Sequence, residues 1–236
     1  MGVEVRRAGD RFRTTTGWLE SRHSFSFGPY FDPDNTGFGL LVVSNDDIVA
    51  PGTGFGTHPH RDMEIVTWVL SGSLVHEDSE GNRGVVHPGL AQRMSAGTGI
   101  LHSERNDAAE PVHFVQMWVL PDEPGLPPSY AQHELGPALD SGALVPVASG
   151  LPGHDAAIRI NQKHAAFSVA RIRPGDEVSL PAAPYVHVFV ARGAVGLEDG
   201  GTLETGDAAR IRDGARKLTC GPAPAEVLVW EMYDAG

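Results

Sequence analysis

The feature that most constrains this fold is a rhythm of short apolar runs separated by turn-forming residues. Glycine (29) and proline (18) are spread through a chain of 236 residues. The segments between them are rich in β-branched and aromatic residues, and the clearest are GFGLLVVSN, EIVTWVLSG, VHFVQMWVLP, FSVARIRPG, YVHVFVARG and EVLVWEMYD. Strands bounded by such turns at short spacing are typical of an all-β sandwich or barrel. The sequence therefore predicts an all-β protein, with a single helical turn expected in PPSYAQHELG.

The chain contains two similar halves. GSLVHED (72–78) and GAVGLED (193–199) both place Glu-Asp five and six positions after the first glycine. A pair of glycines eight residues apart follows in each half, at Gly89 and Gly97 and at Gly206 and Gly214. Self-similarity of this kind indicates a repeated structural unit. We therefore expect two stacked β-barrels of the same design.

A connection between the halves is indicated by composition. The segment from Pro121 to about Gly153 is rich in proline and glycine, as linkers between compact units often are. We place the first barrel at residues 1–130 and the second at residues 131–236.

Charge and composition narrow the classes of function. The formal net charge is -12, and a chain without a basic face is a poor partner for nucleic acid. No apolar run reaches the roughly 20 residues of a membrane-spanning helix, and the N-terminus lacks the apolar stretch of a secretory signal. A single cysteine, Cys220, excludes an internal disulfide. We expect a cytoplasmic protein that does not bind membranes and is a monomer.

Histidines are concentrated in the first half, where six of the 11 lie between residues 58 and 113. His58 and His60 are two residues apart in THPHRDME, and Glu64 follows at the same parity. His102 and Glu104 are likewise two apart in GILHSERN. Residues i and i+2 of a strand point to the same face. The two pairs therefore meet at one interior point if their strands lie opposite each other.

Three histidines and a carboxylate inside an apolar barrel are costly to bury without partners. A divalent metal ion satisfies them together, and a set of nitrogen and oxygen ligands without sulfur suits Fe, Ni, Mn, Cu or Zn. The alternative is that these histidines lie on a solvated strand face. Two pairs with matching spacing, each near glycine turns, favour the metal site, with the carboxylate supplied by Glu64 or Glu104.

The second half lacks these residue types. Counted from the matching glycines, the positions of the three histidines hold Ser179, Pro181 and Thr219, and those of the two glutamates hold Tyr185 and Gly221. We therefore expect one metal ion per chain, in the first barrel, and a second barrel that is structural.

Three segments closely resemble the pirin family of bicupins: HSFSFGPYFDP (23–33), GFGTHPHRDMEIVTWVLSGSLVHEDSEGN (54–82) and MSAGTGILHSERN (94–106). The resemblance is strongest over residues 15–125. Within the family, the short bacterial form that acts as a quercetin 2,3-dioxygenase is the most similar. The resemblance implies two tandem cupin barrels, a fold also known as the double-stranded β-helix or jelly roll.

The resemblance also implies a ligand set. The chain departs from the general cupin pattern in two ways that pirins share: Gly72 comes one residue late, and Gly97 stands where many cupins have proline. In pirins the carboxylate ligand comes from the second motif. The implied metal ligands are His58, His60, His102 and Glu104, and Glu64 becomes a supporting carboxylate or an alternative ligand.

The activity implied by the resemblance is opening of a flavonol ring, such as that of quercetin, by O2 with loss of carbon monoxide. Glu104 would act as general base, and the substrate would be a small aromatic enol. We expect one divalent metal ion per chain, with Fe(II) as the first choice and Ni, Mn, Cu, Zn or Co as alternatives. An alternative is a regulatory, redox-sensing pirin that binds a protein partner, with a structural or sensory metal. A third is another cupin reaction, such as isomerisation.

A planar substrate needs an apolar slot with few polar groups. The candidate pocket residues, all near the two metal-binding segments, are Phe55, Trp68, Met94, His113 and Gln116. Strand parity separates His113 and Met117 from Gln116 and Trp118, and the sequence leaves open which face is inside. For the aromatic residues, the alternative is a place in the ordinary core.

Overall fold

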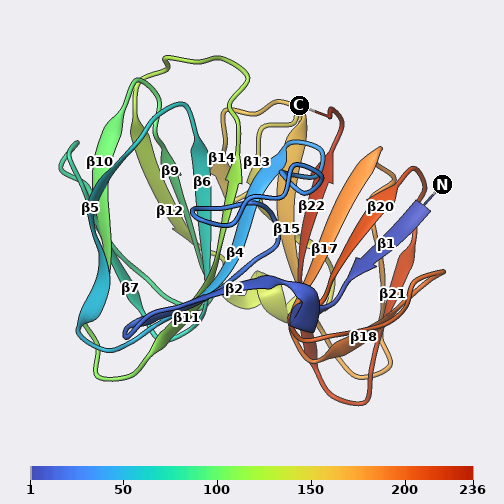
Figure 1. The fold of residues 1–236 in the computed structure, drawn as a ribbon. Helices are drawn as coiled ribbons and strands as arrows, with labels where there is room; N and C mark the ends of the chain where they lie inside the picture. Colours follow the sequence, from blue (N-terminus) through green and yellow to red (C-terminus); the bar gives the residue numbers. More distant parts are fainter. Residues whose placement is uncertain (1, 236) are drawn as a thin grey trace.

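Two β-barrels stand side by side, each made of one large and one small sheet (Figure 1). Within residues 2–235, all strand pairs are antiparallel except β13–β14. The computed structural model describes residues 2–235, which form 22 strands and two short 3-10 helices. The all-β class predicted from the sequence is confirmed.

The first barrel consists of strands β2 to β12. Its large sheet has, in spatial order, β12 (Ser129–Glu134), β9 (Leu90–Ser95), β6 (Glu64–Ser71), β11 (Val112–Val119), β4 (Leu41–Val49), β3 (Leu19–His23) and β2 (Phe12–Thr15). Its small sheet has β5 (Thr53–His60), β10 (Ile100–Asn106), β7 (Leu74–Asp78) and β8 (Arg83–Val86).

The second barrel has the same two-sheet construction. Its large sheet has β1 (Gly2–Arg6), β20 (Ala208–Arg212), β17 (Tyr185–Arg192), β22 (Ala225–Met232), β15 (Ala165–Ile172), β13 (Val145–Ser149) and β14 (Ile158–Arg159). Its small sheet has β16 (Glu177–Ser179), β21 (Lys217–Cys220), β18 (Ala194–Leu197) and β19 (Gly201–Glu204). The helices are η1 (Ala8–Asp10) and η2 (Gly136–Ser141). Within residues 2–235, no helix has the length and apolar character needed to cross a membrane.

The two barrels share one strand order. In the large sheets, the sequence of neighbours β9-β6-β11-β4 corresponds to β20-β17-β22-β15. In the small sheets, β5-β10-β7-β8 corresponds to β16-β21-β18-β19. The two glycine-led repeats of the sequence lead into β7 and β18, which occupy the same place in their sheets. The predicted tandem arrangement is therefore confirmed.

The six longest apolar runs form central strands of the large sheets, namely β4, β6, β11, β15, β17 and β22. The two large sheets face each other in the middle of the molecule, so their strands are buried on both faces (Figure 1). Trp68 and Met117 of the first barrel share one core with Phe167 and Trp230 of the second. Burial on both faces explains why most of these runs have successive apolar residues rather than a strict alternation of apolar and polar ones.

Edge strands of the large sheets come from unexpected parts of the chain. β1 pairs over its whole length with β20 of the second barrel, in the place that β12 occupies beside β9 in the first barrel. The boundary predicted between residues 130 and 131 falls inside β12, and residues 2–6 belong to the second barrel's sheet. Proline and glycine content marks loops, but it does not tell which sheet a strand joins.

The helical turn expected in PPSYAQHELG is wrong. Residues 129–134 form the edge strand β12, and η2 begins only at Gly136. Pairing with β9 decides the conformation of this segment, because strand formation depends more on neighbours than on local preference.

His187 of β17 is a titratable group buried in the seam between the barrels. It is 1% exposed, and its ring centroid lies 5.9 Å from that of Phe25 and 6.5 Å from that of Phe38. Burial, with Arg210 and Arg11 nearby, lowers the pKa of His187 to about 3. In the unfolded chain a histidine has a pKa of about 6.5. Below that pH the unfolded state binds a proton that the folded state does not, so stability falls as the pH drops toward 3.

We predict that His187→Gln loses less stability than the wild type between pH 7 and pH 5. The loss in the free energy of unfolding should differ by about 2 kcal/mol between the two proteins. The reason is that the free energy of unfolding of the wild type falls by about 1.4 kcal/mol per pH unit below 6.5. Urea unfolding at both pH values measures it. His133→Gln, at an exposed position of β12, is the control and should follow the wild type. Identical pH dependence in His187→Gln and the wild type would refute the assignment.

Candidate functional site

Two neighbouring strands of the small sheet bring the predicted metal ligands together. In the antiparallel pair β5–β10, His58 lies directly opposite His102, and the register shifts between His102 and Glu104. The Nε2 atoms of His58 and His102 are 3.1 Å apart, and candidate ligand atoms of His58, His60 and His102 all lie within 4.8 Å of one another. Two nitrogens bound to one ion at about 2.1 Å each, near a right angle, span about 3 Å. The spacing therefore fits a shared metal ion.

The protonation of these histidines also suits a metal. The Nδ1 of His58 donates to the carbonyl of Gly56 at 2.7 Å, which leaves its Nε2 as the unprotonated nitrogen facing His102. The buried Nε2 of His60 has no hydrogen-bond partner among the described residues. Burial lowers the pKa of His60 to about 4 and that of His102 to about 2, with the neighbouring histidines adding to both shifts. Both rings are neutral at pH 7, the form that binds metals.

His76 is a further residue of the candidate site, to which the sequence analysis assigned no role. It is fully buried on β7, where it lies opposite Glu104, while Asp78 lies opposite His102. Its Nε2 is 3.0 Å from the carboxylate of Asp78, and its Nδ1 is 3.4 Å from the Nδ1 of His102. With Nε2–H donated to Asp78, the Nδ1 of His76 accepts from His102. That contact leaves the Nε2 of His102 free to face His58 and orients the ring, as the outer partners of metal-binding histidines do.

A signal for His76 was present in the sequence. His76 and Asp78 are two residues apart in GSLVHED, the same spacing as the other two pairs. Its Nδ1 or Nε2 also lies within 4.8 Å of ligand atoms of His102 and Glu104, so the three form a second candidate group.

Glu104 lies at the inner end of the site and is held by an amide. The Nε2 of Gln116 is 2.9 and 2.8 Å from its two carboxylate oxygens, and the Oε1 of Gln116 accepts from Trp118 at 3.1 Å. Burial raises the pKa of Glu104 to about 7, although the hydrogen bond from Gln116 acts in the opposite direction. No cation among residues 2–235 contributes to this balance, so a bound metal ion would supply the missing positive charge.

A cavity of about 410 Å³ opens onto this group. Its walls include four aromatic side chains: the ring of Phe55 meets Trp18 edge-on at 5.1 Å, and Phe27 meets Trp118 edge-on at 5.5 Å. The polar lining includes the ligand candidates and their support, His58, His60, Glu104 and Gln116. The structure thus places Phe55 and Gln116 where the sequence analysis expected them.

The remaining pocket candidates lie elsewhere. Trp68 faces the second barrel and donates its Nε1–H to Glu226 at 2.7 Å. Met94 is buried in a small core cluster and does not line the cavity. The Nε2 of His113 is 2.6 Å from Asp46, outside the cavity. Trp68 and His113 lie on the outer faces of their strands, because alternate positions of a strand face opposite ways. Met94 instead packs with Ile65 and Ile100.

Strand β11 resolves the parity that the sequence left open. Gln116 and Trp118 line the cavity, whereas Met117 packs into the core between the barrels. The face that carries Gln116 and Trp118 is therefore the inner face of the first barrel.

The carboxylate of Glu64 is directed toward Ser95 and Asn161 and not toward the histidines. It accepts hydrogen bonds from the hydroxyl of Ser95 at 2.8 Å and from the backbone and side-chain N–H groups of Asn161 at 3.0 and 3.1 Å. Between His60 and Glu64 the chain leaves β5 and turns through Asp62, which has a φ of 46°. The same-face rule holds only within one strand, so the parity of Glu64 carried no information about its direction.

Asp47 is a second acid of the cavity that sequence analysis did not single out. It lies on β4, is 4% exposed, and its Oδ1 has no hydrogen-bond partner among residues 2–235. Burial raises the pKa of Asp47 to about 7, and the charges of Asp46 and Glu104 add to the shift against the hydrogen bond from Ser21. In the sequence it is one of two adjacent aspartates inside an apolar strand, a pattern without a distinctive spacing.

Tandem β-barrels, with imidazoles and a carboxylate gathered inside the first, define a bicupin with a candidate metal centre. The sequence profile of the family described as "Pirin" matches residues 4–119, and that of the "Quercetinase C-terminal cupin domain" matches residues 147–232. The chain belongs to the pirin family, as the sequence motifs indicated.

Relatives and solved structures agree with this assignment. The Mycobacterium bovis protein named "Putative quercetin 2,3-dioxygenase Mb0187c" is 61% identical over 98% of this chain and 95% of its own length. The quercetin 2,3-dioxygenase of Escherichia coli K12 is 37% identical over 98% of both chains. The crystal structure of the bacterial pirin YhhW of Escherichia coli in complex with nickel(II) has a TM-score of 0.90 and 35% identity, covering 99% of this chain and 100% of that one. The histidine group and this nickel complex together support a metal ion.

Gly54 of β5 allows the close approach on which the site depends. Its φ is 155°, and a Cβ there would overlap the carbonyl oxygen of Glu104 and lie 2.6 Å from the Cα of Arg105. Gly56, two residues along the same strand, has no other atom within 4 Å of such a Cβ. The two glycines therefore form a matched pair.

We predict that Gly54→Ala weakens metal binding at least about tenfold, the size of effect seen when the support of a metal ligand is lost. The added methyl group pushes β5 away from β10 and separates His58 from His102. Competition with a chelator and measurement of bound metal provide the test. Gly56→Ala should bind metal as the wild type does, and equal affinity in the two variants would contradict the argument.

Proposed function

We propose that this chain is a metal-dependent dioxygenase that opens the ring of a flavonol such as quercetin with O2. The proposed metal ligands are His58, His60, His102 and Glu104. The observation that carries the proposal is that His58, His60 and His102 form one close group, with Glu104 in a second group that shares His102. They lie beside an aromatic-walled cavity of about 410 Å³, a volume typical of small-molecule sites. The relatives named as quercetin 2,3-dioxygenases support the same class of reaction.

The cavity walls would orient the substrate. Trp18, Phe27, Phe55 and Trp118 offer ring faces and edges that suit a flat aromatic ligand. The same side chains exclude water from the reacting atoms.

Glu104 would take the proton of the substrate's enol hydroxyl. When bound, a divalent ion supplies Lewis-acid charge that lowers the pKa of such a hydroxyl. Burial raises the pKa of Glu104 to about 7, which suits a group that accepts a proton near neutral pH and later returns it to the opened product. Gln116 holds both carboxylate oxygens, and Trp118 holds the amide of Gln116.

The metal we propose is Fe(II), with Ni, Mn, Cu, Zn or Co as alternatives that a set of three imidazoles and one carboxylate also accepts. The chain of contacts Asp78–His76–His102 fixes one ligand from behind. It should keep the ring of His102 in place whichever ion binds.

We predict that the protein, loaded with Fe(II) without air and then mixed with quercetin and air, consumes O2 and releases carbon monoxide. His102→Ala should lose bound metal. Glu104→Gln should lower kcat/KM by about 100-fold or more, because the general base is gone. Glu64→Gln changes another buried glutamate of the same barrel in the same way, and it should keep both metal and activity.

Two results would speak against the proposal. Turnover that is unchanged in His102→Ala and Glu104→Gln would exclude a role for this group of side chains. Absence of turnover with any flavonol, together with specific capture of a protein partner by the metal-loaded chain, would favour the regulatory alternative.

A further inference from the structure

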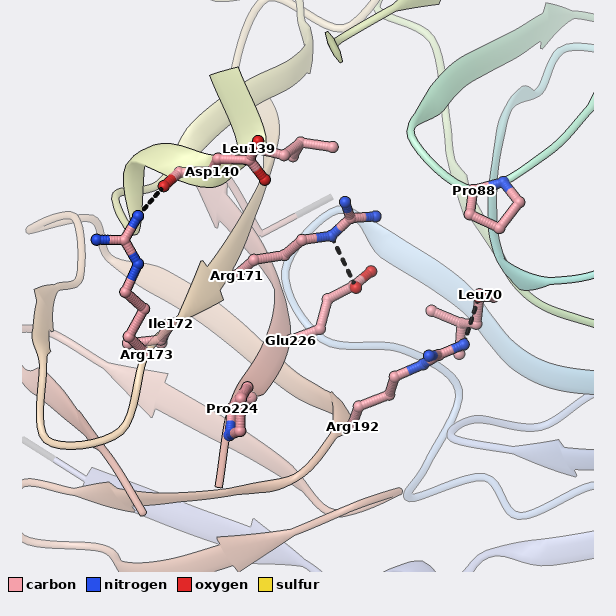
Figure 2. Close-up of a pocket in the computed structure, with 11 residues that line it drawn as sticks. Leu70, Pro88, Leu139, Asp140, Arg171, Ile172, Arg173, Arg192, Pro224 and Glu226 are labelled. Atoms are coloured by element: carbon pink, nitrogen blue, oxygen red, sulfur yellow. Dashed lines mark hydrogen bonds and ion pairs between the residues drawn. The ribbon is translucent and has the colours of Figure 1, made fainter. Parts of the chain in front are cut away.

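A second cavity, of about 630 Å³, lies on the seam between the two barrels (Figure 2). It shares no lining residue with the histidine cavity. The first barrel contributes the end of β6 and the loop before β9, and the rest comes from η2 and the ends of β15, β17 and β22. Apolar side chains form part of the wall, namely Leu70, Pro88, Leu139, Ile172 and Pro224.

Arg171 is fixed in this cavity by a carboxylate. Its Nε donates to one oxygen of Glu226 at 3.1 Å, and the other oxygen of Glu226 accepts from the indole N–H of Trp68 at 2.7 Å. Both oxygens of Glu226 are therefore engaged within the protein. In Figure 2 the terminal nitrogens of Arg171 point away from Glu226, and no hydrogen bond within residues 2–235 uses them. They remain available as donors.

Two further arginines line the cavity, and neither has a carboxylate partner among the described residues. Arg173 donates to the backbone carbonyl of Asp140 at 2.9 Å, and Arg192 donates to that of Leu70. A backbone carbonyl orients a guanidinium group but does not neutralise its charge, and each group keeps other N–H donors.

The charge of this cavity is opposite to that of the chain. Three arginines face two carboxylates, those of Glu226 and Asp140, so the lining is positive overall. The whole chain carries a net charge of -12, with only 18 lysines and arginines. A positively charged cavity raises the local concentration of anionic ligands, even on a molecule whose net charge is negative.

We propose that the inter-barrel cavity binds a small organic anion, consisting of a carboxylate or phosphate group joined to a compact apolar part. The oxyanion would be held by the free N–H groups of Arg171 and Arg192, whose planar forks match its geometry. The apolar part would lie against Leu70, Pro88 and Leu139. This site is independent of the histidine group and of the reaction proposed there.

Binding is tested directly with simple probes. The wild-type protein is titrated with benzoate, phenyl phosphate, inorganic phosphate and neutral phenol, by calorimetry and by tryptophan fluorescence. Trp68 reports on the site because Glu226 connects its indole N–H to Arg171. We expect saturable binding of the aromatic anions that weakens as salt rises, and tighter binding of phenyl phosphate than of inorganic phosphate. The comparison of benzoate with phenyl phosphate shows which headgroup the site prefers, and either preference supports the proposal.

Variants assign the binding to this cavity. Arg192→Gln and Arg173→Gln leave no buried carboxylate unpaired, so they should fold, and Arg192→Gln should weaken binding about tenfold through the loss of a charge-assisted hydrogen bond. Arg83→Gln, at an exposed position of β8, removes the same charge elsewhere and should bind as the wild type does. The metal-free and metal-loaded proteins should bind equally.

Three outcomes would overturn the proposal. The first is no saturable binding of any anionic probe up to about 10 mM, the limit of weak specific affinity. The second is phenol binding as tightly as benzoate, which would make the cavity merely apolar. The third is affinity for the anions that is the same in Arg192→Gln, Arg83→Gln and the wild type.

Discussion

The pairing of β5 with β10 is the constraint on which the candidate metal site depends. It sets His58 against His102 across two strands that are far apart in the sequence. A slip of one residue would turn the side chains of β10 to the opposite face and scatter the imidazoles. On its other edge β10 pairs with β7, which brings His76 behind His102. Gly54, without a Cβ, is what allows β5 to lie so close to Glu104.

The second barrel supports the first without sharing its ligands. Both groups of candidate ligands found in residues 2–235 lie in the first barrel. The second barrel instead covers the outer face of the first barrel's large sheet, where Trp230 and Phe167 pack with Trp68 and Met117. β11 is thereby packed on both faces, and it also carries the amide that holds Glu104. A packed wall of this kind holds the side chains of the candidate site to a narrow range of positions.

The spacing of residues in the sequence predicted the individual strands better than it predicted which strands pair with each other. The i, i+2 rule grouped His58 with His60 because both lie on one strand, and it failed for Glu64 because a turn intervenes. His76 lies beside His102 because β7 pairs with β10. The local sequence does not reveal that pairing. The same holds for the edge strands: β1 and β12 were not assigned to their sheets, because the choice of a strand's partner is a property of the whole chain.

The pairing of β1 with β20 of the second barrel affects how the chain folds during synthesis. β1 is synthesised before the other described strands, yet its partner β20 is among the last of them. All strands of the histidine-bearing barrel are therefore synthesised while β1 still lacks its partner and has an unpaired edge. Such long-range pairing is slow and leaves strand edges exposed to wrong partners. A purification tag fused next to β1 would consequently affect the pairing of β1 with β20, and so the second barrel, which is completed last.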